Sequence, residues 1–255
     1  MDQTANFSNF LVSDVVILKT ENGSRTFKIH IDLLGDKSEV ILAGFDKRFN
    51  ENDSGMFICT DTSEETLSRF VEWAYRGDYQ VEADSMLNHT DFAPPYGTDT
   101  GNNISMLTAT ELASEVERHP LFSHLLLYIF GDIYLISPLK HLAFAKIMEY
   151  LRMTGRLLRV GSLEVIVAVF ATAFAKLPDC DPFLTWIAQY GVWCIQSLRL
   201  HQSFMELLKT TPHLSVRLIS AMEASQFPPW ATQGLCDNQL PENMAAGGDV
   251  NFDGW

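Results

Sequence analysis

The chain has few basic side chains for its length. It carries 18 Lys and Arg against 32 Asp and Glu over 255 residues, a formal net charge of −14. Nucleic-acid binding needs a concentrated basic face, and electrostatic adhesion to an anionic membrane surface needs one too. The composition therefore argues against both kinds of partner.

Long hydrophobic runs are also missing. The most apolar stretch, 121–136, is interrupted by Ser123, His124 and Asp132. It is too short and too polar to cross a bilayer core about 30 Å thick. Residues 1–8 carry neither the basic nor the apolar segment of a secretory signal. We therefore expect a cytoplasmic or nuclear protein.

Cysteine is scarce and scattered. Cys59, Cys180, Cys194 and Cys236 form no C-x-x-C pair, and no cluster of histidines and cysteines has the spacing of a zinc site. Free, buried thiols in a reducing compartment are the plainest interpretation. We predict no metal site and no cofactor.

Recognised catalytic motifs are absent from the sequence. It contains neither a G-x-S-x-G elbow nor a phosphate-binding P-loop. His30 follows a predicted strand, where a hydrogen-bonded core histidine is commoner than a catalytic base. Residues 249–254 match the start of an EF-hand loop but lack its glutamate ligand. We predict no catalytic residue and no small-molecule substrate; an enzyme using His30 or the helical half is the remaining alternative.

The first third, 13–79, has the pattern of a compact α+β unit. Short apolar runs predict strands at 14–18, 25–29 and 55–59, and a small helix begins near Lys37. Together these elements predict a small sheet with helices packed against it.

The last helix of this unit has the clearest local signals. Thr62 and Glu65 have the spacing of a capping box, which predicts the helix start. Gly77 predicts its end in a left-handed conformation. An apolar stripe that would face the core comprises Leu67, Phe70, Val71, Ala74 and Tyr75.

The remaining chain divides by composition. Residues 1–12 form a flexible leader, about 82–118 an acidic, disordered insertion rich in proline and glycine, and 225–255 an acidic, disordered tail. Apolar periodicity predicts helices at 121–134, from Ser137, and at 162–175, 182–198, 202–209 and 212–224. Ser137 and Asp181, each followed by proline, are the predicted caps of two of them. The second half is therefore expected to be helical.

The order of these features resembles the BTB/POZ domain of the fungal single-domain kind. The residues that carry the resemblance before the insertion are Asp14, Val15, His30, Leu33, Ser38, Phe49, Glu51, Phe70, Val71, Ala74, Tyr75, Gly77 and Tyr79. After it, Leu127–Leu139 resembles the next helix pair, including Tyr134, with Gly131 where the family more often has alanine.

The resemblance implies an α+β BTB/POZ fold over 13–151, a small mixed sheet flanked by helices. By position and helicity, 152–224 is similar to a BACK-like extension. It also implies a non-enzymatic protein-interaction module that homodimerises and serves as a substrate adaptor of a cullin-based ubiquitin ligase. A self-associating scaffold or transcription-related cofactor without a ligase role is the alternative.

Two residue pairs receive roles from this resemblance. Asp14 and Lys37 match a charged pocket at the dimer edge; otherwise they form a solvated pair contributing about 0–1 kcal/mol. Phe49 and Glu51 match the loop that faces a cullin; otherwise they belong to a helix-to-strand connection with Phe49 packed inward.

Overall fold

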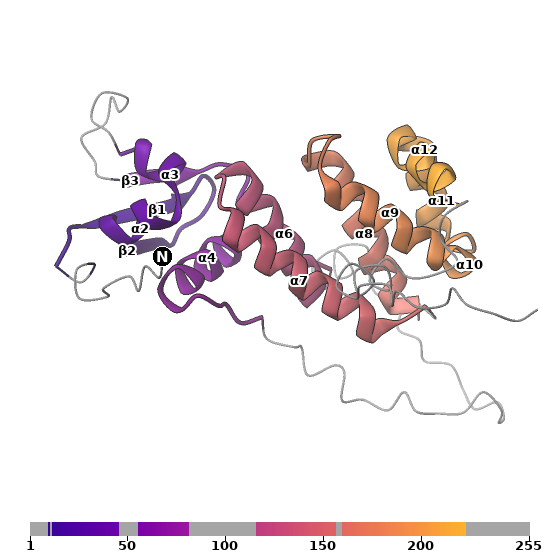
Figure 1. The fold of residues 1–255 in the computed structure, drawn as a ribbon, viewed down its shortest axis with the longest axis horizontal. Helices are drawn as coiled ribbons and strands as arrows, with labels where there is room; N and C mark the ends of the chain where they lie inside the picture. The colour runs from indigo at the N-terminus through magenta and orange to yellow at the C-terminus, as the bar shows by residue number, and fades with distance from the viewer. Residues whose placement is uncertain (1–9, 11, 46–55, 82–115, 157–159, 223–255) are drawn as a thin grey trace, which may run out of the picture.

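The computed structural model describes residues 10, 12–45, 56–81, 116–156 and 160–222. A small sheet with short helices lies at one end of the molecule, and the helices of the C-terminal half lie at the other (Figure 1). The helices α6 (Pro120–Ile133) and α7 (Ser137–Thr154) run side by side between them. The α+β class predicted from the sequence is therefore confirmed.

The sheet has three strands in the order β2-β1-β3. Strand β1 (Val15–Thr20) pairs antiparallel with β2 (Thr26–His30) and parallel with β3 (Met56–Cys59). Side chains alternate along β1, so that Val16 and Leu18 are buried while Val15 is exposed. The predicted strands are confirmed, with ends that differ by one or two residues.

Two short helices, α2 (Ile31–Lys37) and α3 (Glu39–Ala43), meet at Ser38. The Ser38 hydroxyl accepts a hydrogen bond from the Ile41 amide at 3.2 Å and donates one to the Tyr134 carbonyl at 3.0 Å. One buried side chain therefore starts α3 and joins the sheet region to the end of α6.

Helix α4 (Glu64–Arg76) begins one residue later than the sequence indicated. Ser63 is its N-cap and accepts from the Thr66 amide, whereas the Thr62 hydroxyl donates to the Thr60 carbonyl. The predicted capping box of Thr62 and Glu65 is therefore wrong. Gly77 ends the helix at φ 73° and confirms the predicted left-handed end.

The helical half continues with α8 (Val160–Lys176), α9 (Pro182–Trp193), α10 (Ile195–Leu198), α11 (Gln202–Thr210) and α12 (Pro212–Ala221). Asp181 caps α9 by accepting from the Phe183 amide. The helix predicted over 182–198 is broken at Cys194, which ends α9 and precedes α10. The N-cap of α7 is Ile136, which makes no side-chain cap bond, and Ser137 is already the first residue of the helix. The predicted cap at Ser137 is therefore wrong.

Three predicted segments lie mostly or wholly outside the described residues. They are the leader at 1–12, the insertion at 82–118 and the tail at 225–255. Phe10 is described and packs, half-buried, against the core. Within the described ranges, no helix combines the length and apolar character that a membrane crossing requires.

Ser38→Ala is expected to lower the free energy of unfolding by about 2 kcal/mol. The change removes an N-cap bond and leaves the Tyr134 carbonyl without this partner. Urea unfolding followed by circular dichroism measures the loss.

Ser137→Ala is the matched control, because Ser137 is exposed at the start of α7 and makes no cap bond. It should change stability by less than about 0.5 kcal/mol. Equal effects of the two variants would contradict the assigned role of Ser38.

Candidate functional site

One candidate surface lies where strand β3 meets the turn between α6 and α7. The Phe57 ring lies 5.9 Å from the Phe45 ring and 6.1 Å from the Tyr134 ring, measured between centroids. Phe45 and Met56 flank the segment 46–55, so both ends of that segment emerge near this turn. Phe49 and Glu51 themselves lie outside the described residues.

Tyr134 anchors the turn from inside. Its ring packs against Phe130 at 4.5 Å, and only 5% of the residue is exposed. Burial raises the pKa of the Tyr134 phenol well above its usual range and raises the pKa of the Cys59 thiol to about 11. Both groups therefore stay protonated and neutral at physiological pH, as part of a packed core.

Leu135 projects from the same turn into solvent. It is 74% exposed, and the preceding Ile133 is 44% exposed. The backbone of Leu135 has φ 54°, a left-handed conformation that is uncommon for a branched side chain and costs about 1–2 kcal/mol. We call Ile133 and Leu135 the exposed turn. Nothing in the apolar periodicity of the sequence singled out either residue.

Gly131 explains why this turn is so tight. A Cβ atom at Gly131 would lie 3.0 Å from the Lys140 backbone nitrogen, because α6 and α7 approach closely there. The Ile136 amide donates to the Gly131 carbonyl at 2.7 Å. Glycine at this position therefore allows the close backbone approach of the two helices.

The structure does not bring Asp14 and Lys37 together. The Lys37 ammonium pairs with Asp36 at 2.9 Å and lies 5.8 Å from the Trp73 ring centroid. Asp14 is exposed, and its backbone carbonyl accepts from the Ile31 amide at 2.8 Å. Within the described residues the two charges thus have separate neighbours, and a shared pocket stays a prediction about an assembled dimer.

The remaining predicted residues belong to the α+β unit and the turn after α6: Leu33, Ser38, Phe70 and Tyr134 are buried, His30 and Tyr75 are half-buried, and Gly77 is exposed at the end of α4. The Nδ1 atom of half-buried His30 lies 2.7 Å from the Tyr75 hydroxyl, which links β2 to α4. Leu33 is 1% exposed, and Phe70 packs against Phe130 at 4.8 Å. His30 is therefore engaged in a structural hydrogen bond, as the sequence indicated.

The thiols divide into two groups. Cys59 and Cys194 are buried and free, as predicted, whereas Cys180 is exposed. Cys236 lies outside the described residues. Burial raises the pKa of Cys194 to about 11, which keeps it an unreactive thiol.

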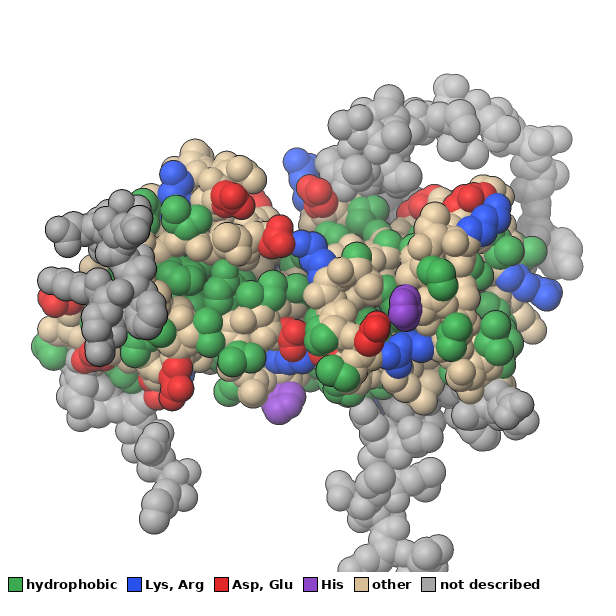
Figure 2. Space-filling view, turned by 90° about the horizontal axis from the view of Figure 1, so that it is seen from above, with side chains coloured by type: hydrophobic (Ala, Val, Ile, Leu, Met, Phe, Trp, Pro, Cys, Tyr) green, Lys and Arg blue, Asp and Glu red, His purple; other side chains and the backbone are tan. Residues whose placement is uncertain are grey.

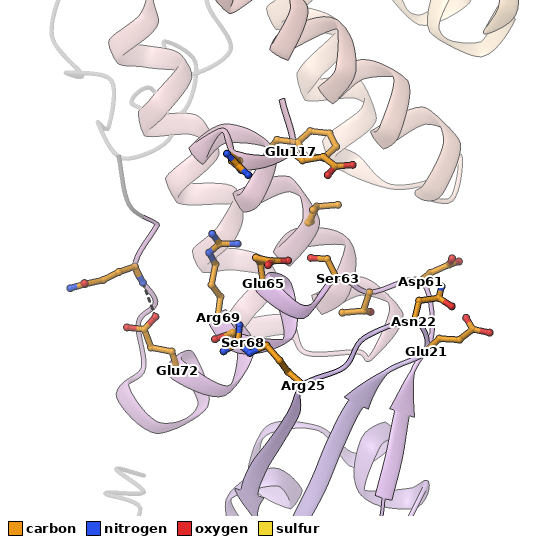
Figure 3. Close-up of a pocket in the computed structure, with 15 residues that line it drawn as sticks. Glu21, Asn22, Arg25, Asp61, Ser63, Glu65, Ser68, Arg69, Glu72 and Glu117 are labelled. Carbon is orange, nitrogen blue, oxygen red and sulfur yellow. Dashed lines mark hydrogen bonds between the residues drawn. The ribbon is translucent and has the colours of Figure 1, made fainter. Parts of the chain in front are cut away.

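A polar cleft of about 900 Å³ lies beside α4 (Figure 3). Glu65 and Arg69 of α4 line it together with Glu117, so acidic and basic side chains are interspersed. The Ser63 hydroxyl at its edge caps α4, and Glu72 accepts from the Gln80 amide at 3.1 Å. Mixed charges engaged in local bonds provide neither an activated nucleophile nor a phosphate cradle.

A metal site is not formed by the side chains of the described ranges, which contain no group of three or more His, Cys, Asp or Glu suited to one ion. The described side chains of the polar cleft form no such group either, because its carboxylates are interspersed with arginines. The cleft is best described as a solvated surface between the sheet and α6.

A second polar cluster joins α6, α7 and α9. The Lys140 ammonium pairs with Asp132 and, at 2.7 Å, with Asp181. The Tyr128 hydroxyl also donates to Asp181, at 2.8 Å. The Asp181 side chain is 1% exposed. Burial opposes the charge of Lys140, but its hydrogen bonds to Asp132 and Asp181 raise its pKa. Sequence analysis found only the capping role of Asp181.

A third cluster covers the C-terminal end of α4. The Tyr79 hydroxyl lies 2.9 Å from Nδ1 of buried His124, and the Lys146 ammonium donates to the Tyr79 carbonyl at 2.7 Å. Lys146 also pairs with Asp78 at 2.6 Å. Burial, reinforced by the positive charge of Lys146, lowers the pKa of His124 to about 4. His124 is therefore a neutral hydrogen-bonding residue at physiological pH.

Comparisons with known proteins add no relative. No model of a known protein family matches the chain, and no curated protein matches it either.

Stability is expected to fall as pH drops from about 6.5 to about 4, because of His124. The folded state binds this proton less readily than the unfolded chain, whose histidine has a pKa near 6.5. A pKa difference of about 2.5 corresponds to roughly 3 kcal/mol. Thermal unfolding at a series of pH values measures the effect.

His124→Gln should flatten the pH dependence in this window, although its stability at pH 7 will be lower. His141→Gln, at an exposed position on α7, is the control and should retain the wild-type slope. An unchanged slope in His124→Gln would assign the acid sensitivity to other groups.

Proposed function

We propose that this chain is a non-enzymatic protein-interaction module of the BTB/POZ kind, acting in the cytoplasm or nucleus. The observation that carries the proposal is the exposed turn: an apolar Leu135, 74% exposed and held in a left-handed backbone conformation. A largely exposed apolar side chain at a fixed turn offers a contact surface to another molecule.

The surroundings of the exposed turn support a binding role. Hydrophobic side chains form contiguous areas on the face drawn in Figure 2 rather than isolated points. Ile58 on the adjacent strand β3 is 49% exposed. Exposed apolar side chains that lie near one another mark a surface for contact with another protein.

The partner we propose is a cullin scaffold, with this chain as the substrate adaptor of a ubiquitin ligase. The resemblance assigns Phe49 and Glu51 to the cullin-facing loop, and the two ends of their segment lie beside the exposed turn. One continuous surface, comprising that loop and Leu135, would then contact the scaffold.

Phe49→Ala combined with Glu51→Ala is expected to abolish co-purification with the cullin scaffold without unfolding the chain. Leu135→Gly should weaken the same binding at least about tenfold while raising the free energy of unfolding by about 0.5–1 kcal/mol, because glycine relieves the left-handed strain. Pull-down with purified cullin and urea unfolding give the two readouts.

Leu200→Gly is the matched control, since Leu200 is 82% exposed but lies far along the helical half. It should leave cullin binding unchanged. Full binding by the Phe49 and Glu51 double variant would reject the adaptor role, whatever the behaviour of Leu135.

A second candidate function is self-association as a scaffold without a ligase role, or as a transcription-related cofactor. The observation in its favour is an apolar edge before and at the start of β1, where Val12 is 86% and Val15 51% exposed. Asp14 lies between these residues, so a twofold contact here would place its charge at the dimer edge.

Val12→Asp combined with Val15→Asp is expected to raise the dimer dissociation constant at least tenfold, because two charges would be buried in the contact. Light scattering over a concentration series measures it. Val216→Asp, at a 62% exposed position on α12, is the control. A wild-type chain that stays monomeric at high concentration would exclude the scaffold role.

A further inference from the structure

A second hollow, which we call the aromatic groove, lies between α7 and the first turns of α9. It has a volume of about 770 Å³. Its walls are mainly rings: Phe144 meets Trp186 edge to face at 5.1 Å, and Phe183 stacks beside Trp186 at 6.1 Å. The Lys140 ammonium, 4.8 Å from the Tyr128 ring centroid, is also part of the lining.

Trp186, which lines this groove, carries a hydrogen-bond donor without a partner. The residue is 8% exposed, and its indole Nε1 is buried without an acceptor among the described residues. A buried N–H without a partner costs about 1–3 kcal/mol. A ligand that brings a carbonyl oxygen into the groove would remove this cost, since indole nitrogen only donates.

The charges of the groove indicate that its ligand is uncharged. The Lys140 ammonium already contacts two carboxylates, Asp132 and Asp181, so it offers little to an additional anion. Aromatic rings with the unpartnered donor of Trp186 match a proline-rich segment, whose prolines lack N–H groups and leave their carbonyls as acceptors. Aromatic grooves bind such segments in a polyproline II conformation.

We propose that the aromatic groove binds the segment Phe227-Pro228-Pro229-Trp230 of the same chain. This segment combines two adjacent prolines with an aromatic residue at each end. It lies within an uncharged stretch, 224–236, so its entry into an apolar groove removes no charge from water. The prolines would pack against the rings of Phe144 and Trp186, with a backbone carbonyl accepting from Nε1.

The described residues end at Met222, within reach of the groove. Helix α12 packs against α9, and the Arg217 guanidinium donates to the Thr185 hydroxyl at 2.8 Å; Thr185 lines the groove. Met222 follows Arg217 by about 8 Å of helical rise. The five residues from Met222 to Phe227 span at most about 17 Å when extended. The segment is thus tethered close to its proposed site.

The tether gives the segment an advantage over free peptides. A short flexible linker supplies an effective concentration of about 1 mM. If the free segment binds with a dissociation constant of about 0.1 mM, its tethered form would weaken the apparent affinity for an added peptide about tenfold. The segment would then act as a built-in competitor for partners that present the same aromatic and proline chemistry.

The test uses the full chain and a synthetic peptide of residues 224–234. In the variant Phe227→Ala with Trp230→Ala, the peptide should bind about tenfold more tightly than to the wild type, measured by calorimetry. With ¹⁵N-labelled tryptophan, the indole signal of Trp186 should move on this double substitution and return when the peptide is added. The five tryptophans of the chain make that spectrum simple to assign.

Trp186→Phe in the same double variant keeps an aromatic ring but removes the donor, and should weaken peptide binding about fivefold. Trp193→Phe, on the same helix but outside the groove lining, is the matched control and should have no effect. Equal peptide affinity of the wild type and the double variant would overturn the proposal, as would an unmoved Trp186 signal. A dimer that dissociates on Trp230→Ala would overturn it too, by assigning the segment to a second copy.

Discussion

Helix α6 has an almost completely apolar surface, and the need to cover it organises the molecule. Leu127, Tyr128, Ile129 and Phe130 follow one another and are all buried. No single neighbouring element can cover four successive positions, because they point in different directions around the helix. The chain therefore surrounds α6 with α4 on one side and with α7 and α8 on others. The sheet and the helical half are joined by this burial.

The same packing shapes the exposed turn. Close approach of α7 requires the glycine at 131, and the chain must reverse direction within a few residues. The Tyr134 ring is buried against Phe130, and the Tyr134 carbonyl accepts from the Ser38 hydroxyl. The chain therefore reverses direction at Leu135, which adopts a left-handed conformation. The exposure of Leu135 is thus a consequence of the geometry that buries Tyr134. A leucine at this exposed position then offers an apolar contact to a partner.

The sequence predicted those features that depend on local chemistry. The strand predicted at 14–18, the cap at Asp181 and the left-handed end at Gly77 all follow from a few neighbouring residues. It did not predict the pairing of Lys140 with Asp132 and Asp181, because those groups meet only after three helices pack. The caps predicted at Thr62 and Ser137 are wrong because both helix starts differ by one residue from the predicted position: Ser63 caps α4, and Ser137 is already the first residue of α7.

The exposed turn and the aromatic groove lie on one rigid frame. Asp132 and Lys140 flank the turn on either side, and Asp181 joins them to the start of α9, which carries Trp186. Transmission of a signal between two sites requires an element with two arrangements of similar energy. A network with a carboxylate that is 1% exposed and engaged by Lys140, Tyr128 and the Phe183 amide strongly favours one arrangement. An occupant of the groove would therefore influence binding at the turn through the surface it adds or covers, and not by moving Leu135.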